Sequence, residues 1–487
     1  MSTVARNSAF VLSVQLVLKI LAFLFNIYVV RRLGDVHFGQ YSAVMAYVAI
    51  FAIFTDWGMS PYAVREMAQD DRQTGRLLPD IIAIRLLLSL LITIVAPLSA
   101  LWLGKGNDMV LGILIASAGL LLYAFQGPLN SALTARERLD YTSTFTLVNQ
   151  LIFWTLGVLL LVKGLGFIGL VVASLVGVAV TGLLSGWTLF KLGVGKLTLS
   201  LRRWPRLFRA ALPFGISGIS YVFMQRFDTV LMSFLLTDAA VGWYNVPWTL
   251  INMVLLVAQS IAIAMYPSLV RSYSESPASL PQVVWQSIKY LLIVCLPIVV
   301  GGTLLADRII LTLYAAPFAN SVPVLRVVLW ALPSLFLLEL LGRVANTLHL
   351  ERPAARVNVI NAVITVILNL ILVPTLGILG AALALVGGRM IRLAQYWRLI
   401  GNERLVGRRW DVLGRVTAAA AAMGAAVYLL EIPLQRLTAF SALDSKLGLL
   451  TLIAAGAVAY LLALLLSGGL ERRELAFLYR LAKGGRG

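Results

Sequence analysis

Apolar runs alternate with short polar segments along almost the whole chain. A helix needs about 20 residues to cross the hydrocarbon layer of a bilayer, and the runs have that length. The pattern predicts an all-α, polytopic integral membrane protein with about 14 transmembrane helices. The expected helices cover roughly residues 8–31, 38–62, 80–103, 109–133, 142–163, 167–191, 211–236, 241–267, 288–313, 323–348, 355–374, 377–399, 412–430 and 447–467.

The first two apolar runs contain a motif that returns in the second half of the chain. Three residues recur at a single spacing of 203 residues: Asp35, Gly39 and Tyr41 reappear as Asp238, Gly242 and Tyr244. One shared spacing of this size indicates a protein built from two similar halves, as many transporters are.

Two further elements repeat at nearly the same spacing. The sequence LGFIG, with Gly166 and Gly169, returns as LGILG 211 residues later, and Glu137-Arg138 returns as Glu351-Arg352 after 214 residues. Six helices separate equivalent points, so the chain returns to the same side and the repeats are parallel. The predicted organisation is a six-helix lobe over residues 1–191, a basic connector over 192–210, a second six-helix lobe over 211–399, and a linker, last helix pair and tail over 400–487.

The charge of the loops predicts the orientation in the membrane. Basic residues collect on one side, where the 192–210 connector and the 400–411 linker lie. The other side holds only Arg31, Arg32, Lys105, Lys163, Arg308, Arg436 and Lys446. Because basic loops stay in the cytoplasm, we expect both termini to be cytoplasmic. We expect the connector to act as a flexible joint between the halves.

The composition agrees with a membrane protein. The 487 residues are 60% hydrophobic and 13% charged, whereas soluble domains are about 45–50% apolar and about 25% charged. A net charge of +19 would suggest nucleic acid as a partner of a soluble protein. Here membrane orientation explains the charge, and we expect no nucleic-acid partner.

Signatures of an enzyme are absent from the sequence. It contains no phosphate-binding loop and no HExxH motif, its two histidines are far apart, and Cys295 is its only cysteine. The loops are shorter than the roughly 50 residues of a soluble catalytic domain. We therefore expect no catalytic residues, no metal site and no cofactor.

The sequence RRLGDVHFGQYS, followed by TDWGMSPYAVRE, resembles the start of polysaccharide exporters of the lipid-linked oligosaccharide flippase (Wzx-like) type. That family belongs to the multidrug/oligosaccharidyl-lipid/polysaccharide (MOP) exporter superfamily, with the MATE multidrug exporters and the lipid II flippase MurJ. The resemblance implies two lobes around a cavity that opens to one side at a time. It implies a polyprenyl-pyrophosphate-linked oligosaccharide of the O-antigen or exopolysaccharide repeat-unit type as cargo, flipped to the outer leaflet of the cytoplasmic (inner) membrane. Glycan polymerase and export machinery are the further partners that it suggests.

Several bases fall inside predicted membrane helices, where an isolated charge costs at least about 2.5–3.5 kcal/mol. We hypothesise that Lys19 and Arg226 bind the pyrophosphate from equivalent lobes, with Arg343 as a further substrate-binding candidate. The alternative is that they form ion pairs, Arg226 with Asp228 or Asp56, and Lys19 with Asp56. Three other bases lie nearer the helix ends and are expected to extend toward the membrane surface: Arg85, Arg389 and Arg392.

Three acids lie at membrane depth, namely Asp56, Asp228 and Glu339. Burial raises the pKa of a carboxyl group, so each acid could titrate and couple transport to protons, which makes the three acids ion-coupling candidates. The structural alternative is pairing, above all between Glu339 and Arg343, which are one helical turn apart.

Amides at membrane depth are costly unless they are hydrogen-bonded. Gln150 and Asn361 correspond across the repeat, 211 residues apart, and are the amides chosen as sugar-binding candidates. Hydrogen bonds between helices are the alternative.

Two other functions stay open. A drug or cation antiporter of the MATE type would share the fold and carry a smaller cargo. A membrane glycan polymerase or glycosyltransferase would use the same lipid-linked glycans, but such enzymes need a sizeable outer catalytic loop, and the outer loops here are short.

Overall fold

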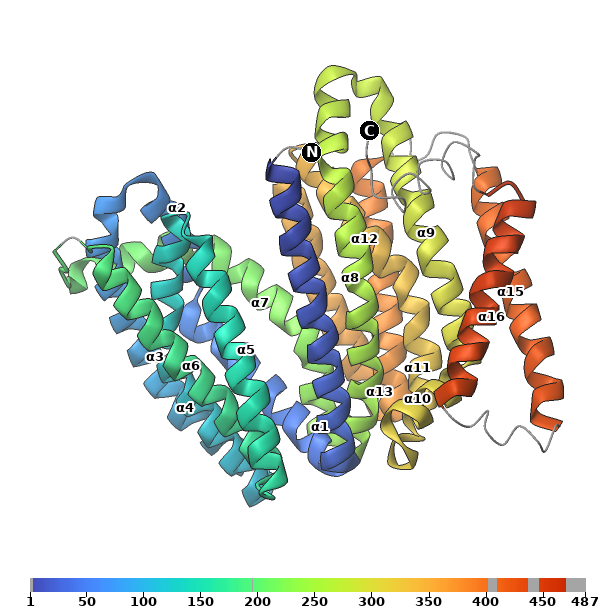
Figure 1. Cartoon of the computed structure of the whole chain (residues 1–487). Coiled ribbons are helices and arrows are strands. Elements are labelled where there is room, and N and C mark those ends of the chain that lie inside the picture. The colour runs from blue at the N-terminus through green and yellow to red at the C-terminus, as the bar shows by residue number, and fades with distance from the viewer. Residues whose placement is uncertain (1–2, 195, 402–409, 437–445, 470–487) are drawn as a thin grey trace. The chain divides into compact units, whose positions relative to one another are not determined.

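The computed structural model describes residues 3–194, 196–401, 410–436 and 446–469, which form helices and no β-strand (Figure 1). The α-helices are α1 Thr3–Asp56, α2 Met59–Gln69, α3 Thr74–Trp102, α4 Asn107–Ala135, α5 Leu139–Val162, α6 Gly166–Lys191, α7 Trp204–Leu235, α8 Asp238–Glu275, α9 Leu280–Leu304, α10 Ala306–Tyr314, α11 Ser321–Val328, α12 Leu332–Thr347, α13 Glu351–Ile400, α15 Trp410–Arg436 and α16 Lys446–Leu466. Short 3₁₀ turns join some of them, at Asp71–Gln73, Leu201–Arg203, Pro277–Ser279, Ala316–Phe318 and Leu329–Ala331.

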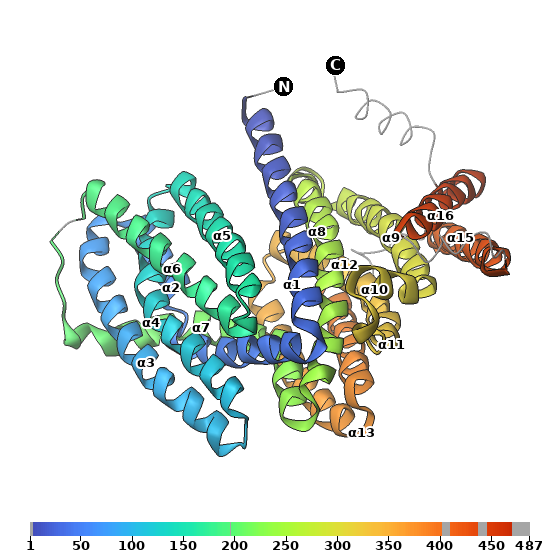
Figure 2. The same cartoon turned by 60° about the horizontal axis from the view of Figure 1, so that its bottom comes forward.

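Within the described residues, twelve helical segments are long and apolar enough to cross a membrane. Two of them each contain one residue without helical geometry, Gly34 in α1 (φ 73°) and Gly377 in α13 (φ 59°). Figure 2 shows α1 bending along its length. The twelve segments confirm the predicted all-α membrane fold, and the kinks divide two of them into two helical parts each. Glycine permits each kink because it adopts positive φ without steric cost.

The chain divides into two compact units that do not follow the sequence halves. The first contains residues 1–245 and 358–381. In it α3 packs on α4, and both α4 and α5 pack on α6. A buried core that includes Met59, Met67, Ile81 and Leu133 joins α2, α3 and α4. The predicted division into two six-helix lobes stays a prediction.

The second unit contains residues 246–357 and 382–487. Here α15 packs on α16 and on α9 around a core that includes Met423 and Val427. The Tyr460 hydroxyl donates a 2.8 Å hydrogen bond to the Ile293 carbonyl. Hydrophobic packing and this bond attach α16 to α9.

Some segments differ from the expectation. α8 continues to Glu275 and α9 begins at Leu280, so most of the segment 268–287 is helical rather than a loop. The predicted helix 288–313 ends at Leu304, and the separate helix α10 follows. Most of the 400–411 linker, residues 402–409, lies outside the described residues.

Backbone geometry bears on two of the internal repeats. Gly166 and Gly377, equivalent at a spacing of 211, have φ of 56° and 59°. Positive φ also occurs at Glu137 (58°) and His349 (55°), which are 212 residues apart. This shared geometry favours His349 as the equivalent of Glu137, two residues before the expected Glu351.

Candidate functional site

The two copies of the repeated Asp–Gly motif contact each other reciprocally inside the first unit. Asp35 follows the Gly34 kink, and its carboxylate accepts a 3.0 Å hydrogen bond from the Trp243 indole N–H. Asp238 begins α8, and its carboxylate accepts a 2.9 Å hydrogen bond from the Gln40 side-chain amide. Each acid is thus bound by the residue that follows the glycine of the other copy of the motif. Sequence analysis found the repeat but not this contact.

Two glycines let the backbones of the two motif copies approach each other closely. A Cβ atom on Gly39 would lie 1.7 Å from the Asp238 carbonyl oxygen, and one on Gly242 would lie 2.3 Å from the Asp35 carbonyl oxygen. No side chain fits at either distance. The glycines of the motif are therefore required for close approach.

Lys105, in the turn between α3 and α4, adds a third contact at the same end of the unit. Its ammonium donates a hydrogen bond to the Ser233 carbonyl, near the C-terminus of α7, and lies 4.7 Å from the centre of the Phe234 ring. The last carbonyls of a helix lack intrahelical donors and favour a cation. Burial lowers the pKa of Lys105, and the charge of Asp238 opposes that shift.

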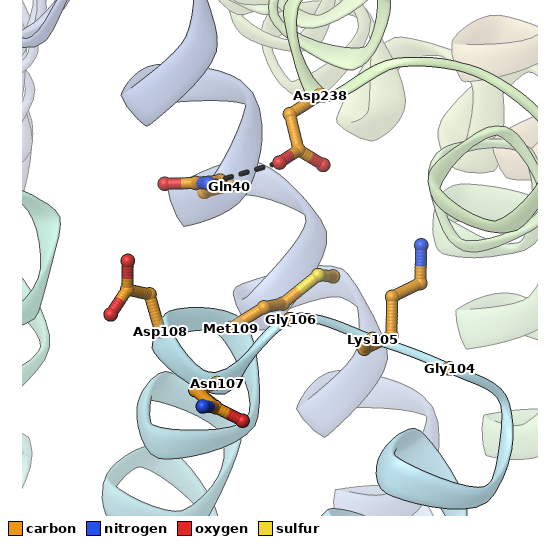
Figure 3. Close-up of a pocket in the computed structure, with 8 residues that line it drawn as sticks. All are labelled: Gln40, Gly104, Lys105, Gly106, Asn107, Asp108, Met109 and Asp238. Carbon is orange, nitrogen blue, oxygen red and sulfur yellow. Dashed lines mark hydrogen bonds between the residues drawn. The ribbon is translucent and has the colours of Figure 1, made fainter.

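A polar pocket of about 460 Å³ lies beside these contacts. It is lined by Gln40, the turn residues from Gly104 to Met109, and Asp238. Figure 3 shows the Gln40–Asp238 hydrogen bond together with the residues of this turn. We call Asp35, Gln40, Lys105, Asp238 and Trp243 the junction.

A buried ion pair lies at the C-terminal end of α1, in the part of the helix that follows the Gly34 kink. The Asp56 carboxylate is 2.8 Å from the Arg85 guanidinium, whose side chain is only 8% exposed. Ser60 bridges the pair, since it donates to Asp56 and accepts a 2.9 Å hydrogen bond from Arg85. The prediction that Arg85 extends to the membrane surface is wrong, because it pairs with Asp56 from the neighbouring helix.

The ion pair adjoins a second close approach of backbones. Gly58 separates α1 from α2 with φ of 76°, and a Cβ there would lie 2.2 Å from the Gly215 nitrogen of α7. This contact holds the α1–α2 turn against α7.

The segment between α6 and α7 is fixed to α3. Asp80 is fully buried and accepts a 2.8 Å hydrogen bond from the Ser200 N–H, and its carboxylate is 2.7 Å from the Arg203 guanidinium. The Thr198 N–H donates to the Gly75 carbonyl at 3.0 Å. The expected flexible joint is therefore wrong for residues 198–203, because a buried carboxylate holds them.

Lys19 and Arg226 both belong to the first unit, on α1 and α7, and both are exposed. Neither forms an ion pair with any residue that the structure describes. The alternative pairings with Asp56 do not occur, because Asp56 binds Arg85. Asp228 instead accepts a 2.5 Å hydrogen bond from the Tyr244 hydroxyl.

The remaining predicted site residues are dispersed. Gln150 is half-buried on α5, and Asn361 is fully buried on α13, both in the first unit. Glu339 and Arg343 are half-buried on α12 in the second unit. Both residues are described by the structure, and they do not form the expected ion pair with each other. Arg389 is buried, so the expectation that it extends outward is wrong.

Sequence reasoning missed two residues that organise the first unit, Asp80 and Lys105. Asp80 stands near the start of an apolar run and was not among the acids considered, although an acid in that position signals a buried partner. Lys105 was only part of the charge count, yet a lone base in a Gly-Lys-Gly turn was a visible signal. Among the described residues, no group of three or more His, Cys, Asp or Glu side chains could hold a metal ion.

Comparison with known proteins gives consistent results. The family described as "Polysaccharide biosynthesis protein" matches residues 4–273, and the MatE family matches residues 213–371. The probable low-salt glycan biosynthesis flippase Agl15 of Haloferax volcanii is 25% identical over 75% of this chain and 76% of its own length. The probable flippase AglR of the same organism is 23% identical over 79% of this chain and 80% of its own length.

Two solved structures share the fold. The lipid II flippase MurJ in an inward closed conformation has a TM-score of 0.71 at 16% identity, covering 92% of this chain and 97% of its own. An inward-facing MATE multidrug transporter of the MOP superfamily has a TM-score of 0.64 at 18% identity, covering 77% of this chain and 93% of its own. The resemblance to the MOP superfamily is confirmed, and the chain belongs to the polysaccharide biosynthesis protein family.

Proposed function

We propose that the protein flips a lipid-linked glycan from one leaflet of a membrane to the other. Family membership and two relatives described as probable flippases support this function. Flipping makes and breaks no covalent bond. The obstacle is the transfer of a charged, hydroxylated head group through hydrocarbon, which is costly unless its polar groups are paired.

The strongest support for the proposal is that Lys19 and Arg226 are exposed bases without a carboxylate partner among the described residues. Both are exposed on membrane helices, and neither is neutralised by a carboxylate among the described residues. An uncompensated base in a membrane helix costs at least about 2.5–3.5 kcal/mol at the centre. An anionic cargo would repay that cost. We therefore assign Lys19 and Arg226 to a phosphate or pyrophosphate on the lipid, with Arg343, Gln150 and Asn361 as further binding candidates.

The basic loops suggest how the junction takes part. If both termini are cytoplasmic, the junction lies at the outer end of its helices. Closing that end while cargo enters from the cytoplasmic leaflet, and releasing it afterwards, is the behaviour expected of alternating access. Hydrogen bonds to charged groups contribute about 1.5–3 kcal/mol each and exchange with water on opening. Such contacts can hold the outer end closed and still break when the helices separate.

Three finer points belong to the same proposal. The membrane is the cytoplasmic (inner) membrane, the cargo carries a repeat unit of the O-antigen or exopolysaccharide type, and a polymerase with export machinery acts downstream. Asp228 and Glu339 remain candidates for ion coupling. Asp56 is also a candidate, although its partner Arg85 favours a structural role.

A deletion strain tests the proposal. Loss of the gene should abolish surface glycan and leave the lipid-linked intermediate on the cytoplasmic side. The wild-type gene should restore export, as should Lys163→Gln, which removes an exposed base from the α5–α6 turn. Lys19→Gln and Arg226→Gln should not. Full export by both variants at normal expression would refute the assigned roles.

The MatE match over residues 213–371 supports a drug or cation antiporter as the second candidate. In that case the deletion strain would become drug-sensitive and keep its surface glycan. Lipid-linked intermediate on the outer face would instead indicate a polymerase or glycosyltransferase.

A further inference from the structure

We propose that residues 196–203 form a strap that lies in the headgroup region of an anionic leaflet and inserts its leucines at the boundary with the acyl chains. The strap is the last part of the segment between α6 and α7. This inference does not depend on the nature of the cargo, because it concerns how the protein contacts the bilayer.

Three polar contacts fix the position of the strap on α3. The Thr198 N–H donates to the Gly75 carbonyl at 3.0 Å, and the Ser200 N–H donates to Asp80 at 2.8 Å. The Arg203 guanidinium lies 2.7 Å from the same carboxylate, which is fully buried. The strap therefore presents a defined outer surface.

That surface is apolar at alternate positions. Leu197, Leu199 and Leu201 are 62%, 59% and 65% exposed. The backbone at Ser200 is extended (φ −148°, ψ 110°), which directs its neighbours Leu199 and Leu201 to the same side. Three exposed leucines within five residues are unfavourable in water but suit the edge of a bilayer.

The charges around the leucines match anionic lipid. Lys196, Arg202 and Arg206 are all exposed. The sequence has no acidic residue between Asp140 and Asp228, so none is available nearby along the chain. A basic, apolar segment of this kind binds the surface of an anionic membrane through lipid phosphates and acyl chains together.

The strap also continues a surface that suits lipid. The end of α6 exposes Leu183, Trp187 and Phe190, by 76%, 58% and 82%, at a spacing that places them on one face. The Lys191 ammonium lies 3.7 Å from the centre of the Trp187 ring. Tryptophan and lysine together are typical of the membrane–water boundary. Lipid is therefore a better partner for the adjoining leucines than a soluble protein.

Fluorescence quenching in lipid nanodiscs tests the proposal on the full-length protein. The only cysteine, Cys295, is buried and can be replaced by alanine. An environment-sensitive probe is then attached at Leu199→Cys, or at Leu197→Cys as a second site. Arg72→Cys, an exposed position in the α2–α3 turn, is the matched control. Nanodiscs contain phosphatidylglycerol and phosphatidylcholine spin-labelled near the headgroup.

We expect the spin-labelled lipid to quench the probes at 197 and 199 and aqueous iodide to quench the probe at 72. Quenching at 197 and 199 should fall in discs of phosphatidylcholine alone and in the Arg202→Gln/Arg206→Gln variant. Iodide quenching at 199 would show that the strap faces water, and protection from both quenchers would show that protein covers it. Either result overturns the proposal, and indifference to phosphatidylglycerol overturns its anionic part.

Discussion

The Gln40 side-chain amide donates a 2.9 Å hydrogen bond to the carboxylate of Asp238, 198 residues further along the chain. Its counterpart in the other copy of the motif, Trp243, donates to Asp35 at 3.0 Å. The two bonds are therefore related by the internal repeat. A symmetric contact of this kind can open by separation of its two sides without any change in local fold.

Gly39 and Gly242, which lie next to Gln40 and Trp243 of the junction, should be intolerant of any side chain. Gly39→Ala places a Cβ 1.7 Å from the Asp238 carbonyl oxygen, so the backbones must separate. Overpacking typically costs about 1–3 kcal/mol. Hydrogen exchange followed by mass spectrometry should show faster exchange over residues 36–45 and 238–245. Gly106→Ala is the matched control, because Gly106 has φ of −63° and open space around it. Equal exchange in the two variants would contradict the close approach.

Lys105 should stabilise the closed junction through the end of α7. Lys105→Gln removes the cation at the Ser233 carbonyl and at the Phe234 ring. A cation at a helix C-terminus contributes about 0.3–1 kcal/mol. Exchange at residues 232–238 should rise several-fold, while Lys163→Gln, in the α5–α6 turn, should leave it unchanged. Lys105→Arg should restore part of the protection, and a Gln variant as protected as wild type would exclude the role.

Asp56 should behave as the partner of Arg85. Asp56→Asn leaves a buried guanidinium without its counter-ion, which typically costs about 3–5 kcal/mol. The thermal midpoint should fall in Asp56→Asn and in Arg85→Gln, and the double variant should lose less than the sum of the two. A variant Asp56→Asn that keeps its thermal midpoint and loses only the pH dependence of transport would show instead that Asp56 is a coupling residue.

The equivalent glycines Gly166, at the start of α6, and Gly377, at the kink of α13, should have similar sensitivity to substitution. Gly166 and Gly377 have φ of 56° and 59°, a region unfavourable for alanine. Each alanine variant should lose about 1–3 kcal/mol of stability. Gly342→Ala, at a position with open space inside α12, should be neutral or stabilising by about 0.5–1 kcal/mol. Thermal unfolding in detergent measures all three variants, and tolerance of alanine at only one of Gly166 and Gly377 would argue against equivalent repeats.

The membrane helices were predictable because their signal is local: a run of apolar residues of sufficient length predicts a crossing wherever it packs. The repeat of Asp35 and Gly39 was visible because it can be found by comparing the sequence with itself. The junction was not, because the sequence does not show that Gln40 meets Asp238. Arg85 was assigned to the membrane surface from its position in its own helix, whereas its partner Asp56 lies on another. The connector was expected to be flexible because it joins the two halves, and the buried Asp80 that fixes residues 198–203 lies over 100 residues earlier.

Reconstituted transport is the direct test of whether Lys19 and Arg226 bind the phosphate groups of a lipid-linked glycan. Purified protein in vesicles is supplied with a fluorescent polyprenyl-pyrophosphate oligosaccharide, and an impermeant reductant reports the fraction of cargo in the outer leaflet. We expect the wild-type protein and Lys163→Gln to exchange the cargo between leaflets. Lys19→Gln/Arg226→Gln should do so at least about tenfold more slowly, as expected for loss of roughly 1.4 kcal/mol. Absence of exchange by the wild-type protein, or equal rates in all three proteins, would contradict it.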